Sequence, residues 1–211
     1  MSDREFAGEK TISVLGGGWS AGLIDRSRIP GPVIAVNESA LLAPCAVAVT
    51  MDRLWAEARF AGLKLLRAHG QIAQAYIRRS AAKNLDLAAE ADWVTVFEND
   101  HTSVDLTDEF GRLNGTNSGV CAINLAYQFR PRRILLFGFD MNRSPSGDPY
   151  WFKPYEWAPG GATKAGKYQA WAAEFGLIRR ACDAAGIEVL NCAPTSAITA
   201  FPKVKPEEVL K

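Results

Sequence analysis

The chain alternates between short apolar runs and longer segments in which apolar residues recur at helical spacing. Six of the short runs are almost continuously apolar, which is typical of strands covered on both faces of a sheet. These runs predict strands at residues 11–15, 33–36, 46–49, 93–97, 134–139 and 187–190.

The clearest predicted helix spans residues 164–185, because its apolar side chains fall on one stripe and Gly186 follows as a C-terminal stop. The stripe consists of Tyr168, Trp171, Ala172, Phe175, Ile178 and Cys182. A second helix is predicted at residues 117–129, where the apolar residues surround the helix and indicate that it is buried. Two further helices are predicted at residues 51–68 and 71–83.

Helices that connect buried strands predict an α/β fold with a Rossmann-like, doubly wound and mainly parallel sheet. No linker, repeat or low-complexity tract interrupts the chain, so we expect a single domain over residues 1–211. Residues 142–166 are the exception to the regular pattern, because proline, glycine and aromatic residues are crowded there. A loop of this length in a domain predicts an irregular lid or binding loop.

Ligands of doubly wound folds bind beyond the carboxyl ends of the strands, and a glycine loop follows the first predicted strand here. Gly16, Gly17 and Gly18 would let the backbone approach a phosphate, with Ser20 capping the next helix or binding the same oxygens. A plain tight turn is the alternative. The spacing also fits a dinucleotide fingerprint, with Glu38 as the ribose-binding acid, so an NAD-linked oxidoreductase is a third hypothesis.

A second cluster of glycine and small polar residues precedes the buried helix. Thr116, Asn117 and Ser118 lie between Gly115 and Gly119, where several N–H groups at the helix start would face an anion. Ordinary N-capping by Thr116 or Asn117 is the alternative interpretation.

Four further polar residues follow predicted strands. Asn37 is predicted to bind a base or ribose, or else to form a turn. Asp52 would bind a ribose or a metal, or cap the following helix, and both interpretations remain open. His101 and Asp140 are the predicted catalytic groups, because histidine is the commonest general base at neutral pH and both residues follow strand ends.

Composition excludes several classes of protein. The chain carries 24 Lys and Arg against 23 Asp and Glu, so general nucleic-acid or acidic-membrane binding is not expected. No apolar run approaches the roughly 20 residues that span a bilayer, and the charged N-terminus lacks a signal sequence, which predicts a cytoplasmic protein. The four cysteines are scattered in apolar surroundings and predict buried side chains, with no metal site.

Three blocks of sequence together resemble a known group of proteins: VLGGGWS, VIAVN and NSGVCAINLAYQFRPRRILLFGFDM. The chain looks like the Rossmann-like proteins that include the family 42 sialyltransferases and the 6-hydroxymethylpterin diphosphokinase-like domain, with small relatives in phages and prophages. The resemblance covers about residues 11–210. It implies that the nucleotide is bound by Gly16, Gly17, Gly18, Ser20, Asn37, Asn117, Ser118 and Gly119, with Asp140, Thr195 and Ser196 closing one edge, and Asp52 is added as a nucleotide contact from its place after a strand.

The resemblance implies a nucleotide-dependent transferase, glycosyltransferase-like, which uses a nucleotide-sugar donor without a tightly bound cofactor or metal. The alternatives are a magnesium- and ATP-dependent phosphotransferase or diphosphotransferase, and a non-catalytic protein that senses or sequesters a nucleotide. The acceptor is open, a nucleobase included, and so is homo-oligomer formation.

The sequence departs from the resemblance at one point. The sialyltransferases place a general-base histidine after the strand matched here by LLFGFD, whereas residues 142–166 contain none. His101 or a carboxylate such as Asp148 or Glu156 would replace it, or the reaction differs, or catalysis is lost.

Overall fold

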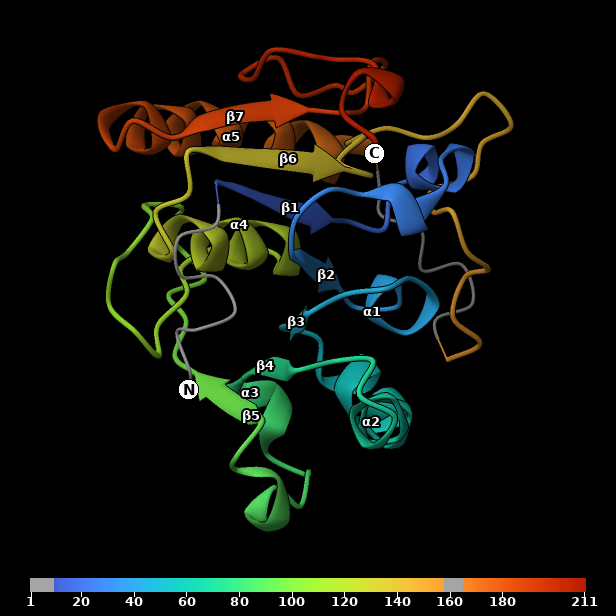
Figure 1. The fold of residues 1–211 in the computed structure, drawn as a ribbon, viewed down its shortest axis with the longest axis vertical. Coiled ribbons are helices and arrows are strands. Elements are labelled where there is room, and N and C mark those ends of the chain that lie inside the picture. Colours follow the sequence, from blue (N-terminus) through green and yellow to red (C-terminus); the bar gives the residue numbers. More distant parts are fainter. Residues whose placement is uncertain (1–9, 158–164) are drawn as a thin grey trace.

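The computed structural model describes residues 10–157 and 165–211, which form one seven-stranded parallel sheet between layers of helices (Figure 1). The strand order is β5-β4-β3-β2-β1-β6-β7. The predicted α/β, doubly wound architecture is therefore confirmed. The strands are β1 (Thr11–Leu15), β2 (Val33–Val36), β3 (Val47–Thr50), β4 (Gln74–Arg78), β5 (Val94–Phe97), β6 (Arg133–Phe137) and β7 (Glu188–Asn191).

The order of the strands creates one topological switch point. From β1 the chain adds β2, β3, β4 and β5 in one direction, and then returns to place β6 on the other side of β1. From the same edge of the sheet, the chain consequently continues in opposite directions after β1 and after β6. A crevice outside this edge is where doubly wound folds bind ligands.

Each face of the sheet is covered by its own helices. The buried helix α4 (Ser118–Gln128) and α5 (Ala165–Ala184) share one hydrophobic cluster with Ile12 and Val14 of β1. The short α1 (Ser39–Leu42) and α2 (Arg53–Ala68) pack on the other face, where Leu15 of β1 points. The alternation of side chains along a strand explains why both faces of β1 are apolar.

The predicted helix at residues 71–83 is wrong, because this segment contains the strand β4 and only the short helix α3 (Arg79–Ala82). Gly70 ends α2 with a φ of 66°, and the chain then enters the sheet between β3 and β5. A short apolar run such as this one fits a strand or one face of a helix equally well. Pairing with two neighbouring strands decides between them.

The boundaries of the other elements differ from the predicted ones by one or two residues at most ends. The sixth strand ends at Phe137 instead of residue 139, because Gly138 turns the chain with a φ of 67°. The predicted irregular segment is observed over residues 142–157, and residues 158–164 of the same prediction lie outside the described part of the chain. Short 3₁₀ helices occupy Trp19–Leu23, Arg26–Arg28, Ala88–Glu90 and Pro206–Glu208.

Within the two described ranges, no helix has both the length and the apolar character that crossing a lipid bilayer requires.

Candidate functional site

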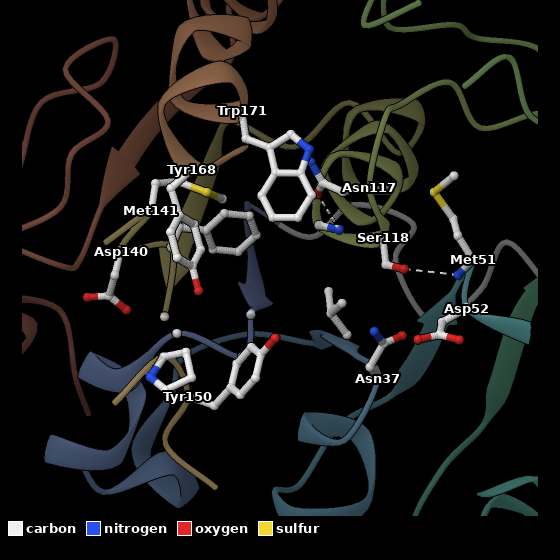
Figure 2. A pocket seen from close by; sticks show the side chains of 18 of the residues that line it. Asn37, Met51, Asp52, Asn117, Ser118, Asp140, Met141, Tyr150, Tyr168 and Trp171 are labelled. Carbon is white, nitrogen blue, oxygen red and sulfur yellow. Dashed lines mark hydrogen bonds between the residues drawn. The ribbon is translucent and has the colours of Figure 1, made fainter. Parts of the chain in front are cut away.

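A cavity of about 430 Å³ opens at the carboxyl edge of the sheet, over the switch point (Figure 2). Its walls come from the loops after β1, β2, β3 and β6, the end of β4, the start of α4, the first turn of α5 and the β6–α5 loop (residues 142–157). Of the predicted nucleotide-binding and catalytic residues, the cavity brings together Gly16, Gly17, Gly18, Asn37, Asp52, Asn117, Ser118, Gly119 and Asp140.

Two of the three consecutive glycines are needed for close packing between the loops after β1 and β6. The N–H of Gly16 donates to the Phe137 carbonyl at 2.8 Å, and that of Gly18 donates to the Gly138 carbonyl at 2.9 Å. A Cβ on Gly18 would lie 2.1 Å from Asp140 Oδ2. Gly17 differs, because a Cβ there would meet the Phe152 and Tyr150 rings at 3.4 Å or more. Gly17 is thus the loop glycine that is best placed toward a ligand.

Ser20 lies in a 3₁₀ helix of five residues instead of the predicted helix with a free N-terminus. Its N–H and its hydroxyl both donate to Asp140 Oδ2, at 3.2 and 3.0 Å. The loop after β1 is therefore tied to the loop after β6 by side-chain as well as backbone hydrogen bonds. Ser20 supports Asp140 in this arrangement.

Asp140 is a buried carboxylate with one oxygen that accepts hydrogen bonds and one that has no partner among the described residues. Its exposed fraction is 1%, and Oδ1 has no hydrogen-bond partner among the described residues. Burial raises the pKa of this carboxyl, while the hydrogen bonds from Ser20 oppose the shift. An unsatisfied buried oxygen in a cavity wall is a suitable acceptor for a ligand hydroxyl.

Asn37 offers a second open oxygen across the cavity from Asp140 (Figure 2). Its Oδ1 is buried and has no partner among the described residues. Its backbone adopts a φ of 49°, which non-glycine residues rarely do and asparagine tolerates best. Met141, another cavity residue, has the same φ. Left-handed residues of this kind concentrate at functional sites.

Two polar side chains that the sequence suggested as ligand contacts cap the helices around the cavity. Asn117 Oδ1 accepts from the N–H groups of Gly119 and Val120, at 3.0 and 3.1 Å, and so caps α4. Asp52 Oδ1 accepts from the Trp55 N–H at 3.1 Å and caps α2. Both side chains line the cavity as well as capping their helices.

Four predicted site residues lie outside the cavity lining, and Ser20, described above, is one of them. His101 is exposed in the turn after β5, and Thr195 is exposed after β7. Ser196 is buried and donates its hydroxyl to the Phe139 carbonyl at 2.6 Å, while the Thr195 carbonyl accepts from Asn142 Nδ2 at 2.7 Å. Through these two hydrogen bonds, Ser196 and Thr195 hold the loop after β6 in place.

The carboxylates suggested as alternatives also lie outside the lining. Asp148 and Glu156 are exposed on the β6–α5 loop. Glu38, the ribose-binding acid of the NAD hypothesis, accepts from Trp55 Nε1 at 2.9 Å and from Arg59 Nε at 3.2 Å. Its carboxylate is therefore engaged with α2, away from the cavity.

Aromatic rings of the β6–α5 loop cover one side of the cavity. Tyr150, Phe152 and Tyr155 line it, and the first two stack with their ring centroids 5.2 Å apart. Burial raises the pKa of the Tyr155 phenol, and the nearby Glu38 charge adds to this effect. The Tyr155 phenol therefore stays neutral at physiological pH and can act as a hydrogen-bond donor.

Sequence reasoning missed several cavity residues, and three of them show why. Tyr168 and Trp171 belong to the apolar stripe of α5, whose later members Phe175 and Ile178 are buried as predicted, whereas its first turn lines the cavity (Figure 2). Arg78 was hidden by the wrong helix at residues 71–83. The apolar run that ends immediately before Arg78 was the available signal.

In the part of the chain that the structure describes, no three His, Cys, Asp or Glu side chains lie close enough together to hold a metal ion.

The fold and the cavity define a doubly wound α/β protein with a cavity at its switch point. Solved sialyltransferases from Campylobacter jejuni share this fold. CstII with the substrate analogue CMP-3FNeuAc matches with a TM-score of 0.60 and 15% identity, over 96% of this chain and 88% of that one. CST-II with CMP and a trisaccharide acceptor matches with a TM-score of 0.61 and 17% identity, over the same shares.

The monofunctional α-2,3-sialyltransferase Cst-I from the same organism also matches, with a TM-score of 0.60 and 14% identity, over 92% of this chain and 80% of that one. No family model matches the sequence, and no curated protein matches it either. The likeness therefore establishes the fold that the resemblance implied. Phage origin, the pterin-kinase relation and a cytoplasmic location stay predictions.

Proposed function

We propose that the protein is a nucleotide-dependent glycosyltransferase that uses a CMP-linked sugar as donor. The observation that carries the proposal is the cavity at the β1/β6 switch point, whose lining includes Asp140 and Asn37, each with a buried oxygen that has no hydrogen-bond partner among the described residues. Sialyltransferases of the same fold were solved with CMP and with CMP-3FNeuAc. The nucleotide occupies the switch point, with its phosphate over Gly17.

Asp140 contacts the nucleotide in this arrangement. Its carboxylate lies beside the glycine loop, held there by Ser20, and its open Oδ1 accepts a ribose hydroxyl. Carboxylates accept ribose hydroxyls in other doubly wound folds. The tyrosines of the β6–α5 loop lie over the same region and donate to the phosphate as it leaves, which stabilises the developing charge.

Thermal melting and calorimetry with CMP, CMP-3FNeuAc, UMP and ATP, each with and without Mg²⁺, test the proposal. A ligand at 100 times its Kd adds about 2.7 kcal/mol of stability. For a chain of this size, that corresponds to a rise of roughly 5–11 °C in the melting temperature. We expect CMP and its sugar to produce this shift without Mg²⁺. If neither does, the nucleotide site is absent.

The variant Asp140→Asn separates two roles for this residue. A ribose contact predicts that the Kd for CMP rises about tenfold or more, because an amide is a weaker acceptor than a carboxylate. If the Kd stays unchanged and only transfer is lost, Asp140 is instead the catalytic group that the sequence suggested.

Two alternatives have distinct outcomes in the same experiment. A Mg²⁺-dependent response to ATP, without a response to CMP, would favour phosphoryl or diphosphoryl transfer. Binding of CMP with no transfer to any acceptor would favour a nucleotide-binding protein without catalysis. One observation favours the second alternative: neither His69 nor His101 lines the cavity.

A further inference from the structure

Arg78 is a cation in the cavity wall that has no counter-ion among the residues the structure describes. It stands at the end of β4 and is only partly exposed. Among the described residues it makes no ion pair within 4.0 Å and no hydrogen bond. Its neighbour Arg79 is more exposed and pairs with Glu98. A partly buried charge without a counter-ion is unfavourable, so the cavity is built to receive an anion there.

The surroundings of Arg78 also favour an anion. Its charge acts on the buried Cys121 thiol in the first turn of α4, where it opposes the rise in pKa that burial causes. Arg78 thus shares the cavity lining with the positive, N-terminal end of an 11-residue helix. Ser118 begins that helix, and its hydroxyl accepts from the Met51 N–H at 2.9 Å, which leaves its proton to donate (Figure 2). The nearby carboxylate of Asp52 is engaged as the cap of α2.

Arg78 lies far from the glycine loop. Four strand spacings separate β4 from β6, about 19 Å in a sheet of ordinary geometry. Gly17 follows β1, three strand spacings from β4, so a nucleotide with its phosphate over Gly17 and its ribose beside Asp140 lies at the other end of the cavity from Arg78. With the nucleotide at the switch point, the end of the cavity over β3 and β4 takes the remaining part of the donor or the acceptor.

We propose that Arg78 is a specificity-determining residue that binds a carboxylate or phosphate group of the transferred sugar or of the acceptor, separate from the phosphate of the nucleotide. The placement of the nucleotide in this inference rests on the proposed function. An arginine forms two parallel, charge-assisted hydrogen bonds with a carboxylate or a phosphate. A neutral ligand does not offer two charged acceptor oxygens for this pair of bonds.

The test compares Arg78→Gln with the matched control Arg79→Gln, which removes the adjacent arginine outside the cavity. Calorimetry measures the Kd for CMP and for CMP-3FNeuAc, whose sugar carries a carboxylate. Melting curves measure the binding of D-glucuronate and D-glucose as acceptor probes with CMP bound, and of inorganic phosphate alone.

We expect Arg78→Gln to bind CMP within twofold of the wild type. If the anion is on the donor, this variant loses about 30-fold or more in affinity for CMP-3FNeuAc, the usual consequence of removing one partner of a buried charge pair. If the anion is on the acceptor, it keeps that affinity and loses the response to glucuronate. Arg79→Gln behaves like the wild type, and Arg78→Lys, which keeps the charge but not the fork, is intermediate.

Two results would overturn the inference: an equal loss of affinity for CMP itself, which would assign Arg78 to the nucleotide phosphate, or no change with any probe. If the wild-type protein binds neither CMP nor CMP-3FNeuAc, the proposed function fails on its own. The melting curves with phosphate and glucuronate then test Arg78 by themselves. An anion site at Arg78 predicts that these anions raise the melting temperature of the wild type and not that of Arg78→Gln. If they do not change the melting temperature of the wild type, the anion site is absent.

Discussion

Asp140 illustrates how a single residue can favour ligand binding at the expense of stability. Its carboxyl has a pKa above the ordinary value of 3.8, because burial disfavours the ionised form more than the hydrogen bonds from Ser20 favour it. The unfolded chain therefore ionises at a lower pH than the folded one. Ionisation destabilises the fold as the pH rises from about 4 through the folded-state pKa.

Replacing Asp140 by asparagine removes this effect and keeps an acceptor for Ser20. We expect Asp140→Asn to melt at a higher temperature than the wild type at pH 7.5 in the absence of ligand. The difference shrinks as the pH falls toward 4, because the carboxyl becomes protonated first in the folded state and then in the unfolded chain. Melting curves between pH 4 and 8 measure it, and a difference independent of pH would refute the explanation.

Asp25 provides a control of opposite sign. It is exposed, and hydrogen bonds from Ser27 lower its pKa. Asp25→Asn should therefore destabilise the protein at neutral pH, with a difference that also vanishes as the pH falls through the lowered pKa.

At the scale of elements, the site depends on two loops that leave neighbouring strands and lie against each other. Gly16 and Gly138 are in backbone contact, and a Cβ on Gly138 would lie 2.8 Å from the Gly16 carbonyl oxygen. Gly138 also has a φ of 67°, which a side chain strains. The sequence suggested that the glycines serve a phosphate, and the fold uses most of them for packing.

Gly138→Ala should lower the free energy of unfolding by about 2–3 kcal/mol, because it introduces both a clash and backbone strain. The melting temperature should fall by roughly 5–10 °C. Gly176→Ala is the matched control: this glycine lies inside α5 with nothing near its missing Cβ. Alanine there should stabilise the helix by about 0.5–1 kcal/mol. Equal effects of the two changes would contradict the packing argument.

At the scale of the whole molecule, the β6–α5 loop covers the cavity because it is anchored outside it. Trp151 Nε1 donates to Ser39 Oγ at 3.1 Å, and the Arg26 guanidinium lies 4.1 Å from the centre of the Trp151 ring. An isolated antiparallel bridge joins Tyr150 to Gly18. These contacts attach the loop to the segment after β1, so its aromatic side chains line the cavity without regular secondary structure.

Trp151→Ala should loosen this cover without altering the cavity wall, since Trp151 is not part of the lining. The lost packing amounts to roughly 1–2 kcal/mol, which increases local opening about tenfold. Hydrogen exchange of residues 149–157 should accelerate accordingly, and the Kd for CMP should rise several-fold. Phe110→Ala, which truncates an exposed ring elsewhere, should change neither. Unchanged exchange in Trp151→Ala would mean that other contacts hold the loop.

Most of the fold was predictable from the sequence, because it depends on local patterns. Continuously apolar runs predicted six strands of a parallel sheet, and helical spacing predicted α2, α4 and α5. The residues after the strands predicted one edge for the site, since parallel strands end on the same side. The strand β4 was missed because its short apolar run carries no local preference, and Arg78 was missed with it.

The composition of the site was decided by tertiary structure. Ser20 and Asp140 are 120 residues apart in sequence yet share hydrogen bonds, and His101 follows a strand end yet lies away from the cavity. The first turn of α5 lines the cavity although its stripe is continuous with the core. A local pattern determines which backbone a segment adopts. Whether a buried polar atom has a hydrogen-bond partner depends on residues that only folding brings near. At this site, the atoms without a partner among the described residues are the ones we propose to bind the ligand.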